Sequence, residues 1–173
     1  HAMETDRLLE KLFDNPELYP LELDFTKERI HFIRMLPLAY KRASFTTYAR
    51  KEALKMTMGI DKLLKYQAAV CPSPHRPIFH IFHIAYCGST LLARCFEAIK
   101  GCFVLKEPRA LYQAGHIRAH LDLTQEGQRE YWKKLLNLIL TLFSRTYHEN
   151  DAVVIKNSDL NSNFIAELLD QYS

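Results

Sequence analysis

The chain has 173 residues, 48% of them hydrophobic, which is enough to bury one sizeable core but too little for two full domains. Its 23 basic and 20 acidic residues leave a net charge of +3. This balance suits an anionic small ligand and lacks the basic excess of a dedicated nucleic-acid binder. The longest strongly apolar stretch, residues 135–143, is roughly half of the ~20 residues that a membrane-spanning helix requires. We therefore expect one soluble domain and no membrane span.

Residues 4–70 predict packing helices, because apolar and charged residues recur there at helical spacing. Thr26 is the expected N-cap of the second helix, with Glu28 in its first turn. Pro72, Pro74 and Pro77 then interrupt the pattern, since proline cannot continue a helix. We accordingly divide the chain into a helical extension, residues 1–76, and an α/β domain, residues 77–173.

After this break, three apolar runs alternate with helical segments. The runs are residues 78–84, 102–105 and 152–155, and a helical stripe of apolar residues covers about 124–147. Continuous apolar strands separated by helices indicate a parallel sheet covered on both faces. The predicted fold class is therefore α/β, with a parallel sheet and flanking helices.

A small-residue loop follows the first predicted strand and leads into a helix. Gly88 allows close approach of a ligand to the backbone, while Ser89 and Thr90 offer hydroxyl and amide groups at a helix N-terminus. Such a loop favours a tetrahedral anion, although the same residues also suit a plain turn and helix cap. The segment lacks the lysine and the earlier glycine of a Walker A motif, which disfavours an ordinary ATPase or kinase.

The segment FHIAYCGSTLLARCF resembles the 5′-phosphosulfate loop of the sulfotransferase family. The segments Leu105-Lys106-Glu107-Pro108-Arg109 and Val154-Ile155-Lys156-Asn157, the latter ahead of a helix over 163–169, lie where that family has its Glu-x-Arg segment and a strand ending in lysine. The resemblance implies a P-loop-type sulfotransferase fold that binds 3′-phosphoadenosine 5′-phosphosulfate without a metal. It is closest to uncharacterised bacterial members, with similarity to tyrosylprotein sulfotransferases. The implied donor-binding residues are Tyr86, Cys87, Gly88, Ser89, Thr90 and Leu91.

The same resemblance implies roles for three charged residues. Glu107 would be the base that takes the proton of the acceptor, and Lys156 would neutralise the leaving phosphate. Arg109 would bind an anionic or peptide acceptor. Each side chain could instead be a solvated charge at a strand end. His83 is an alternative base, although a histidine in an apolar strand is more often a packed core residue.

Two departures from the family pattern keep other functions open. Tyr86 stands where the family usually has Lys or Arg, and the family's 3′-phosphate site would come after Ser173, so we expect a truncated fold. The alternatives are a catalytically degenerate binding module, a P-loop phosphotransferase, and a cysteine phosphatase that uses Cys87. In the last case Arg94 comes one position too late for the Cys-x5-Arg spacing. The acceptor and the oligomeric state stay open.

The remaining signals concern metal and redox state. The cysteines form no CxxC pair and no metal-ligand spacing, which predicts buried, reduced thiols and a cytoplasmic protein. His116 and His120 stand four residues apart on a predicted helix, but no HExxH pattern or third ligand accompanies them. We therefore expect no metal. The four cysteines are Cys71, Cys87, Cys95 and Cys102.

Overall fold

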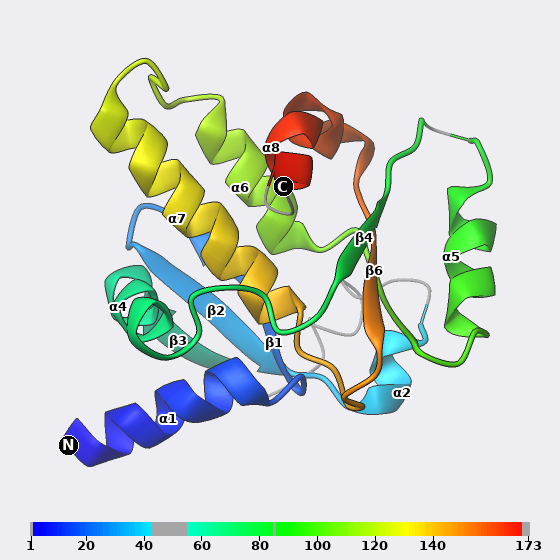
Figure 1. Ribbon diagram of the computed structural model, residues 1–173, viewed down its shortest axis with the longest axis horizontal. Helices are drawn as coiled ribbons and strands as arrows, with labels where there is room; N and C mark the ends of the chain where they lie inside the picture. The colour runs from blue at the N-terminus through cyan, green and yellow to red at the C-terminus, as the bar shows by residue number, and fades with distance from the viewer. Residues whose placement is uncertain (1, 43–54, 85, 171–173) are drawn as a thin grey trace.

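Two three-stranded sheets, one antiparallel and one parallel, form the framework of the protein (Figure 1). The computed structural model describes residues 2–42, 55–84 and 86–170. The first half of this chain contains, in order, α1 (Ala2–Asp14), β1 (Leu18–Asp24), β2 (Arg29–Arg34), α2 (Pro37–Tyr40), β3 (Lys55–Gly59) and α4 (Ile60–Val70). The second half contains β4 (Ile78–Ile81), α5 (Ser89–Glu97), β5 (Cys102–Lys106), α6 (Arg109–Arg118), α7 (Glu126–Phe143), β6 (Ala152–Lys156), the 3₁₀ helix η1 (Asp159–Phe164) and α8 (Ile165–Asp170).

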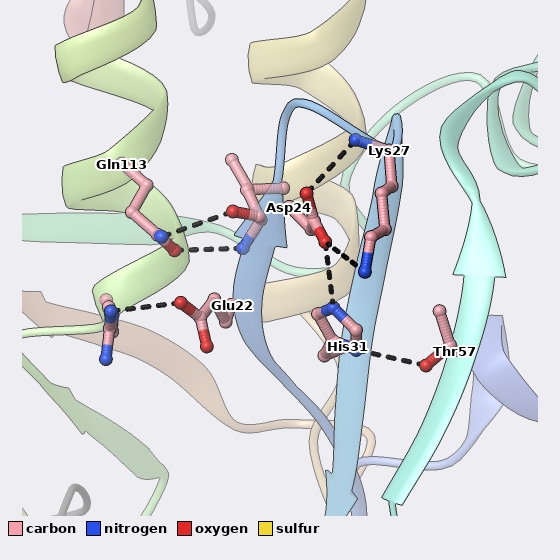
Figure 2. A network of polar contacts seen from close by, with 8 residues as sticks. Glu22, Asp24, Lys27, His31, Thr57 and Gln113 are labelled. Atoms are coloured by element: carbon pink, nitrogen blue, oxygen red, sulfur yellow. Dashed lines mark hydrogen bonds and ion pairs between the residues drawn. The ribbon is translucent and has the colours of Figure 1, made fainter.

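The expectation that residues 4–70 are purely helical was wrong. Antiparallel β1, β2 and β3 occupy much of this segment, and Thr26 lies in the turn between β1 and β2 instead of capping a helix. The Oδ1 atom of Asp24 accepts a hydrogen bond from the Lys27 amide at 3.0 Å, which closes this turn (Figure 2). Glu28 completes the turn with a φ of +50°. Local apolar spacing missed the sheet because β3 joins it from residues 55–59, far along the chain.

The prediction of a parallel sheet was confirmed. Its strand order is β4-β6-β5, so β6, the last of its strands in the chain, lies between the other two. Strand β4 ends at Ile81, three residues before the predicted end of the apolar run at Ile84. The described residues thus form a mixed α/β fold with a three-stranded parallel sheet and flanking helices, whereas the finer P-loop sulfotransferase assignment stays a prediction.

The two faces of the parallel sheet meet different partners, as Figure 1 shows with α5 on one side and α6 and α7 on the other. Under α5, Val104 and Val154 pack with Ala93 in a small cluster. The opposite face adds Leu105 and Ile155 to the main core. This core also takes buried residues from α1, the antiparallel sheet, α6 and α7. The apolar stripe predicted over 124–147 is α7, and it is core as expected.

A buried arginine fastens the N-terminal elements to the end of α7. The guanidinium of Arg145 donates hydrogen bonds to four backbone carbonyl oxygens, at distances of 2.5–2.9 Å. Burial lowers the pKa of Arg145 to about 10, so the group stays charged at neutral pH. A charge this deep is tolerated because its donors are matched by acceptors from several elements. These acceptors are the carbonyl groups of Leu12, Asn15, Leu18 and Leu142.

The C-terminal helix predicted over 163–169 is divided between η1 and α8. Within the described ranges, each helix is too short or too polar to cross a membrane. The division of the chain at residues 76 and 77 into an extension and a domain stays a prediction.

Candidate functional site

The carboxyl ends of the three parallel strands lie in one row. Ile81 pairs with Lys156, and Lys156 pairs with Lys106 on its other side. Ligands of open parallel sheets bind outside this edge. The loop that leads from β4 into α5 starts there, and so do the segments that follow β5 and β6.

Glu107 and Lys156, the two predicted catalytic residues, are in direct contact at this edge. The Nζ atom of Lys156 donates to Oε1 of Glu107 in a short ion pair. The lysine side chain is 7% exposed, whereas the glutamate side chain is 49% exposed. A carboxylate that is open to solvent therefore covers a buried ammonium group. An incoming anion that displaced the carboxylate would reach the ammonium directly.

His83, the alternative base, belongs to the same cluster. Its Nε2 atom lies 2.7 Å from the carbonyl oxygen of Asn157 and 3.7 Å from Oε1 of Glu107. Its Nδ1 atom lies 3.2 Å from the carbonyl oxygen of Ile84, and the one proton of a neutral ring can serve only one of these two oxygens. The shorter contact favours the tautomer with the proton on Nε2. The side chain is 10% exposed, as a packed histidine would be, and it also lies beside Glu107. A packed histidine and a neighbour of the candidate base are therefore compatible here.

Asn157 connects this cluster to the strand ends, a role for which no sequence pattern was found. Its buried side chain donates to Nδ1 of His80 at 3.1 Å and accepts from Nδ2 of Asn161 at 3.2 Å. Its backbone amide donates to the Ile81 carbonyl at 3.0 Å. Burial lowers the pKa of His80 to about 4. A neutral polar network therefore fixes the strand ends that carry the charged groups.

The loop before α5 has the backbone of an anion site but exposes its side chains. Tyr86 and Gly88 have φ values of +61° and +82°, and Gly88 precedes α5 without a side-chain cap on the helix. The first amides of α5 are therefore left to other acceptors. Of the predicted donor-binding residues, only Ser89 is buried; the exposed ones are Tyr86, Cys87, Gly88, Thr90 and Leu91. The expectation of buried thiols was wrong, because Cys87 and Cys95 are exposed and the other two cysteines are only partly buried. Ala85, with which the loop starts, lies outside the described residues.

Backbone strain collects at this edge as well. Among the described residues other than glycine, positive φ values occur at Glu28 in the first hairpin, at Tyr86 and at Glu107, whose φ is +48°. This conformation costs roughly 1–2 kcal/mol for a residue with a side chain. Such outliers gather at functional sites, where the surroundings hold them in place.

Arg109 points away from the cluster and is bound to the other sheet. Its Nη2 atom donates to Oε1 of Glu22 on β1 at 3.0 Å. One turn further along α6, the amide of Gln113 pairs with both backbone polar groups of Leu23 (Figure 2). The structure thus gives the predicted acceptor-binding arginine a partner within the protein.

A second lysine, Lys106, lies in the same row as Lys156 and was not predicted. Its Nζ atom forms an ion pair with Glu97 of α5 and donates to the Arg42 carbonyl at 2.9 Å. Two buried lysines, each neutralised by one glutamate, therefore stand at the carboxyl edge on the side of α5. Among the described residues, no group of three His, Cys, Asp or Glu side chains is arranged to hold a metal ion.

Comparison with known proteins adds no relative. No protein-family model, curated protein or solved structure matches the chain.

Proposed function

We propose that the protein is a sulfotransferase, which moves a sulfonate group from 3′-phosphoadenosine 5′-phosphosulfate to a hydroxyl or amine acceptor. The observation that carries the proposal is the contact of Glu107 with Lys156 and His83 at the carboxyl edge of the parallel sheet. This edge also carries the Gly88 loop that opens α5. An anion cradle, a base and a buried cation are the groups that sulfonate transfer requires.

Each group has a defined part in the transfer. The first amides of α5, together with Ser89 and Thr90, bind the 5′-phosphosulfate. The acceptor oxygen forms a bond to sulfur while the bond from sulfur to the bridging phosphate oxygen breaks, and 3′-phosphoadenosine 5′-phosphate leaves. Glu107 takes the acceptor proton, and Lys156 offsets the charge on the leaving phosphate. For this, Lys156 exchanges Glu107 for the phosphate, since both ligands compete for one buried ammonium.

A binding module without catalysis is the second candidate. It is favoured by Tyr86, whose side chain is fully exposed and supplies no positive charge to the loop. In this case the same site holds the nucleotide but does not accelerate transfer. Lys156 would then contribute to binding of the nucleotide and would not stabilise a leaving group.

Calorimetry with 3′-phosphoadenosine 5′-phosphate and with ATP plus magnesium tests the binding step. We expect the sulfate-donor product to bind more tightly. Tighter binding of magnesium-ATP would overturn the proposal in favour of a phosphotransferase. A radiolabelled donor offered to panels of phenols, sugars and tyrosine peptides then separates the two candidates, since binding without transfer indicates the module.

Kinetics of Glu107→Gln and Lys156→Met test the assigned roles once an acceptor is found. Both variants should lower kcat by roughly 10²- to 10⁴-fold, because these interactions strengthen in the transition state. Glu107→Gln should leave donor affinity nearly unchanged or slightly higher, since it removes the competitor for Lys156. Glu97→Gln is the matched control, because it breaks the neighbouring ion pair with Lys106. A wild-type rate in Glu107→Gln would move the role of base to His83.

A further inference from the structure

The attachment of α6 to the edge of β1 has no part in the chemistry described above. Gln113 joins this edge much as another strand would: its Oε1 accepts from the Leu23 amide at 2.9 Å, and its Nε2 donates to the Leu23 carbonyl at 3.2 Å. Arg109 adds the ion pair with Glu22 one turn earlier. Figure 2 shows both contacts reaching from α6 to the same strand.

This attachment lies directly after the strained glutamate. Glu107 is followed by Pro108, the N-cap of α6, and Arg109 is the first residue of the helix. On the other side, the Glu107 amide donates to the Lys156 carbonyl at 2.7 Å. The left-handed conformation of Glu107 is therefore held between two anchors, β6 before it and β1 after it. A strained residue keeps its conformation only where its surroundings fix it in this way.

We infer that Gln113 and Arg109 are positioning residues, which fasten α6 to β1 and thereby hold Glu107 beside Lys156. Through α6, the antiparallel sheet thus helps to position a residue of the site. The effect of this positioning on sulfonate transfer rests on the proposed function. The link between the attachment of α6 to β1 and the conformation of Glu107 does not rest on it.

The two anchors differ in strength. Both partners of the Arg109–Glu22 pair are more than a third exposed, and such pairs typically change an equilibrium by no more than about fivefold. The contacts of Gln113 are partly shielded, and their loss leaves two backbone groups of β1 without these partners. Gln113 is accordingly the main anchor, and Arg109 is the auxiliary one.

Hydrogen exchange of the Glu107 amide, followed by NMR on the whole chain, tests the link. Gln113→Leu should speed this exchange at least tenfold, while the amides of Val104 and Val154 in the middle of the β5–β6 pairing keep their protection. Glu22→Arg and Arg109→Glu should each speed it about two- to fivefold. The double charge swap should restore the wild-type rate. The matched control is charge reversal of the pair between Arg118, at the other end of α6, and Glu167, which should leave Glu107 unchanged.

The outcomes separate the link from the proposed function. Exchange at Glu107 within twofold of wild type in Gln113→Leu would overturn the inference. It would also be overturned if the charge swap failed to restore what Arg109→Glu disturbs, because the disturbance would then not come from the Arg109–Glu22 contact. If wild type binds no 3′-phosphoadenosine 5′-phosphate, the proposed function fails while the exchange experiment still decides the link. In an active enzyme, Gln113→Leu should lower kcat and keep affinity for this nucleotide within twofold.

Discussion

Acid should weaken this fold through one partly buried histidine. His80 sits in β4, receives a hydrogen bond from Asn157 at 3.1 Å and stacks on Phe82 with ring centroids 5.7 Å apart. Burial lowers its pKa to about 4, whereas the unfolded chain binds the proton with a pKa near 6.5. Because the folded pKa is the lower one, the unfolded state gains protons first. Stability is therefore full above about pH 6.5 and falls as the pH approaches 4.

The magnitude follows from the two pKa values of His80. Their difference corresponds to about 3 kcal/mol when both states are protonated, and to about 2.5 kcal/mol at about pH 4.5. The ring is only partly buried, so we expect a loss of about 1 to 2.5 kcal/mol. Protonation also turns Nδ1 from an acceptor into a donor facing the Asn157 amide. The backbone carbonyl of Asn157 holds His83, so acid should disturb the site before the fold opens.

Urea unfolding at about pH 7.5 and about pH 4.5 measures this effect when wild type is compared with His80→Phe. The phenylalanine keeps the ring stack, and Asn157 retains its contacts with the carbonyls of Ile81 and Ile155 at 3.4 and 3.3 Å. Carboxylates that protonate in acid do so in both proteins, so their contribution cancels. The acid-induced loss should be about 1 to 2.5 kcal/mol smaller in the variant. Equal losses in both proteins would refute the reasoning.

Four further substitutions probe other parts of the fold. Arg145→Met should cost about 1–3 kcal/mol in urea unfolding, because four carbonyl groups lose their donor while the burial of a cation is relieved; an unchanged midpoint would contradict this balance. Burial raises the pKa of Tyr147 to about 12, so its stabilisation is complete below about pH 10 and is lost between 10 and 12, and Tyr147→Phe should flatten the alkaline decline seen by circular dichroism. Gly88→Ala should cost about 1 kcal/mol through its positive φ alone, since a Cβ atom there meets nothing within 4 Å. Gly115→Ala should lower the free energy of unfolding by about 1–3 kcal/mol, seen as a lower melting temperature, because its Cβ would lie 2.2 Å from Cε1 of Phe164.

The parallel half of the fold could be predicted because its signals are local. Each strand is mostly apolar, with His80 as the exception in β4, and each is followed by a helix or a turn. Once the strands are taken as parallel, their carboxyl ends must meet, which is why Glu107 and Lys156 could be expected at one edge. Their direct ion pair follows from the register of Lys106 opposite Lys156, a detail that no local pattern contains.

The antiparallel half could not be found in the same way. The apolar residues of β2 are Ile30, Phe32 and Ile33, a spacing that fits a helix as well as a twisted strand. Only pairing with β1 and with the distant β3 decides between the two structures. The partner of Arg109 was hidden for the same reason, since Glu22 belongs to this sheet. The family resemblance therefore assigned Arg109 to an acceptor, and its ion pair with Glu22 could not be read from the sequence.

The hydrogen bonds of Arg145 also set an order of events during synthesis. The carbonyl groups of Leu12 and Leu18 precede their donor by 133 and 127 residues. At a translation rate of about 5–20 residues per second, these two residues are synthesised roughly 6 to 27 seconds before this arginine. Throughout this interval the apolar faces of α1 and β1 lack α7, against which they finally pack. During this time the exposed apolar residues of the N-terminal segment can aggregate or bind a chaperone. Slower translation before residue 145 lengthens this exposure and should lower the yield of folded protein.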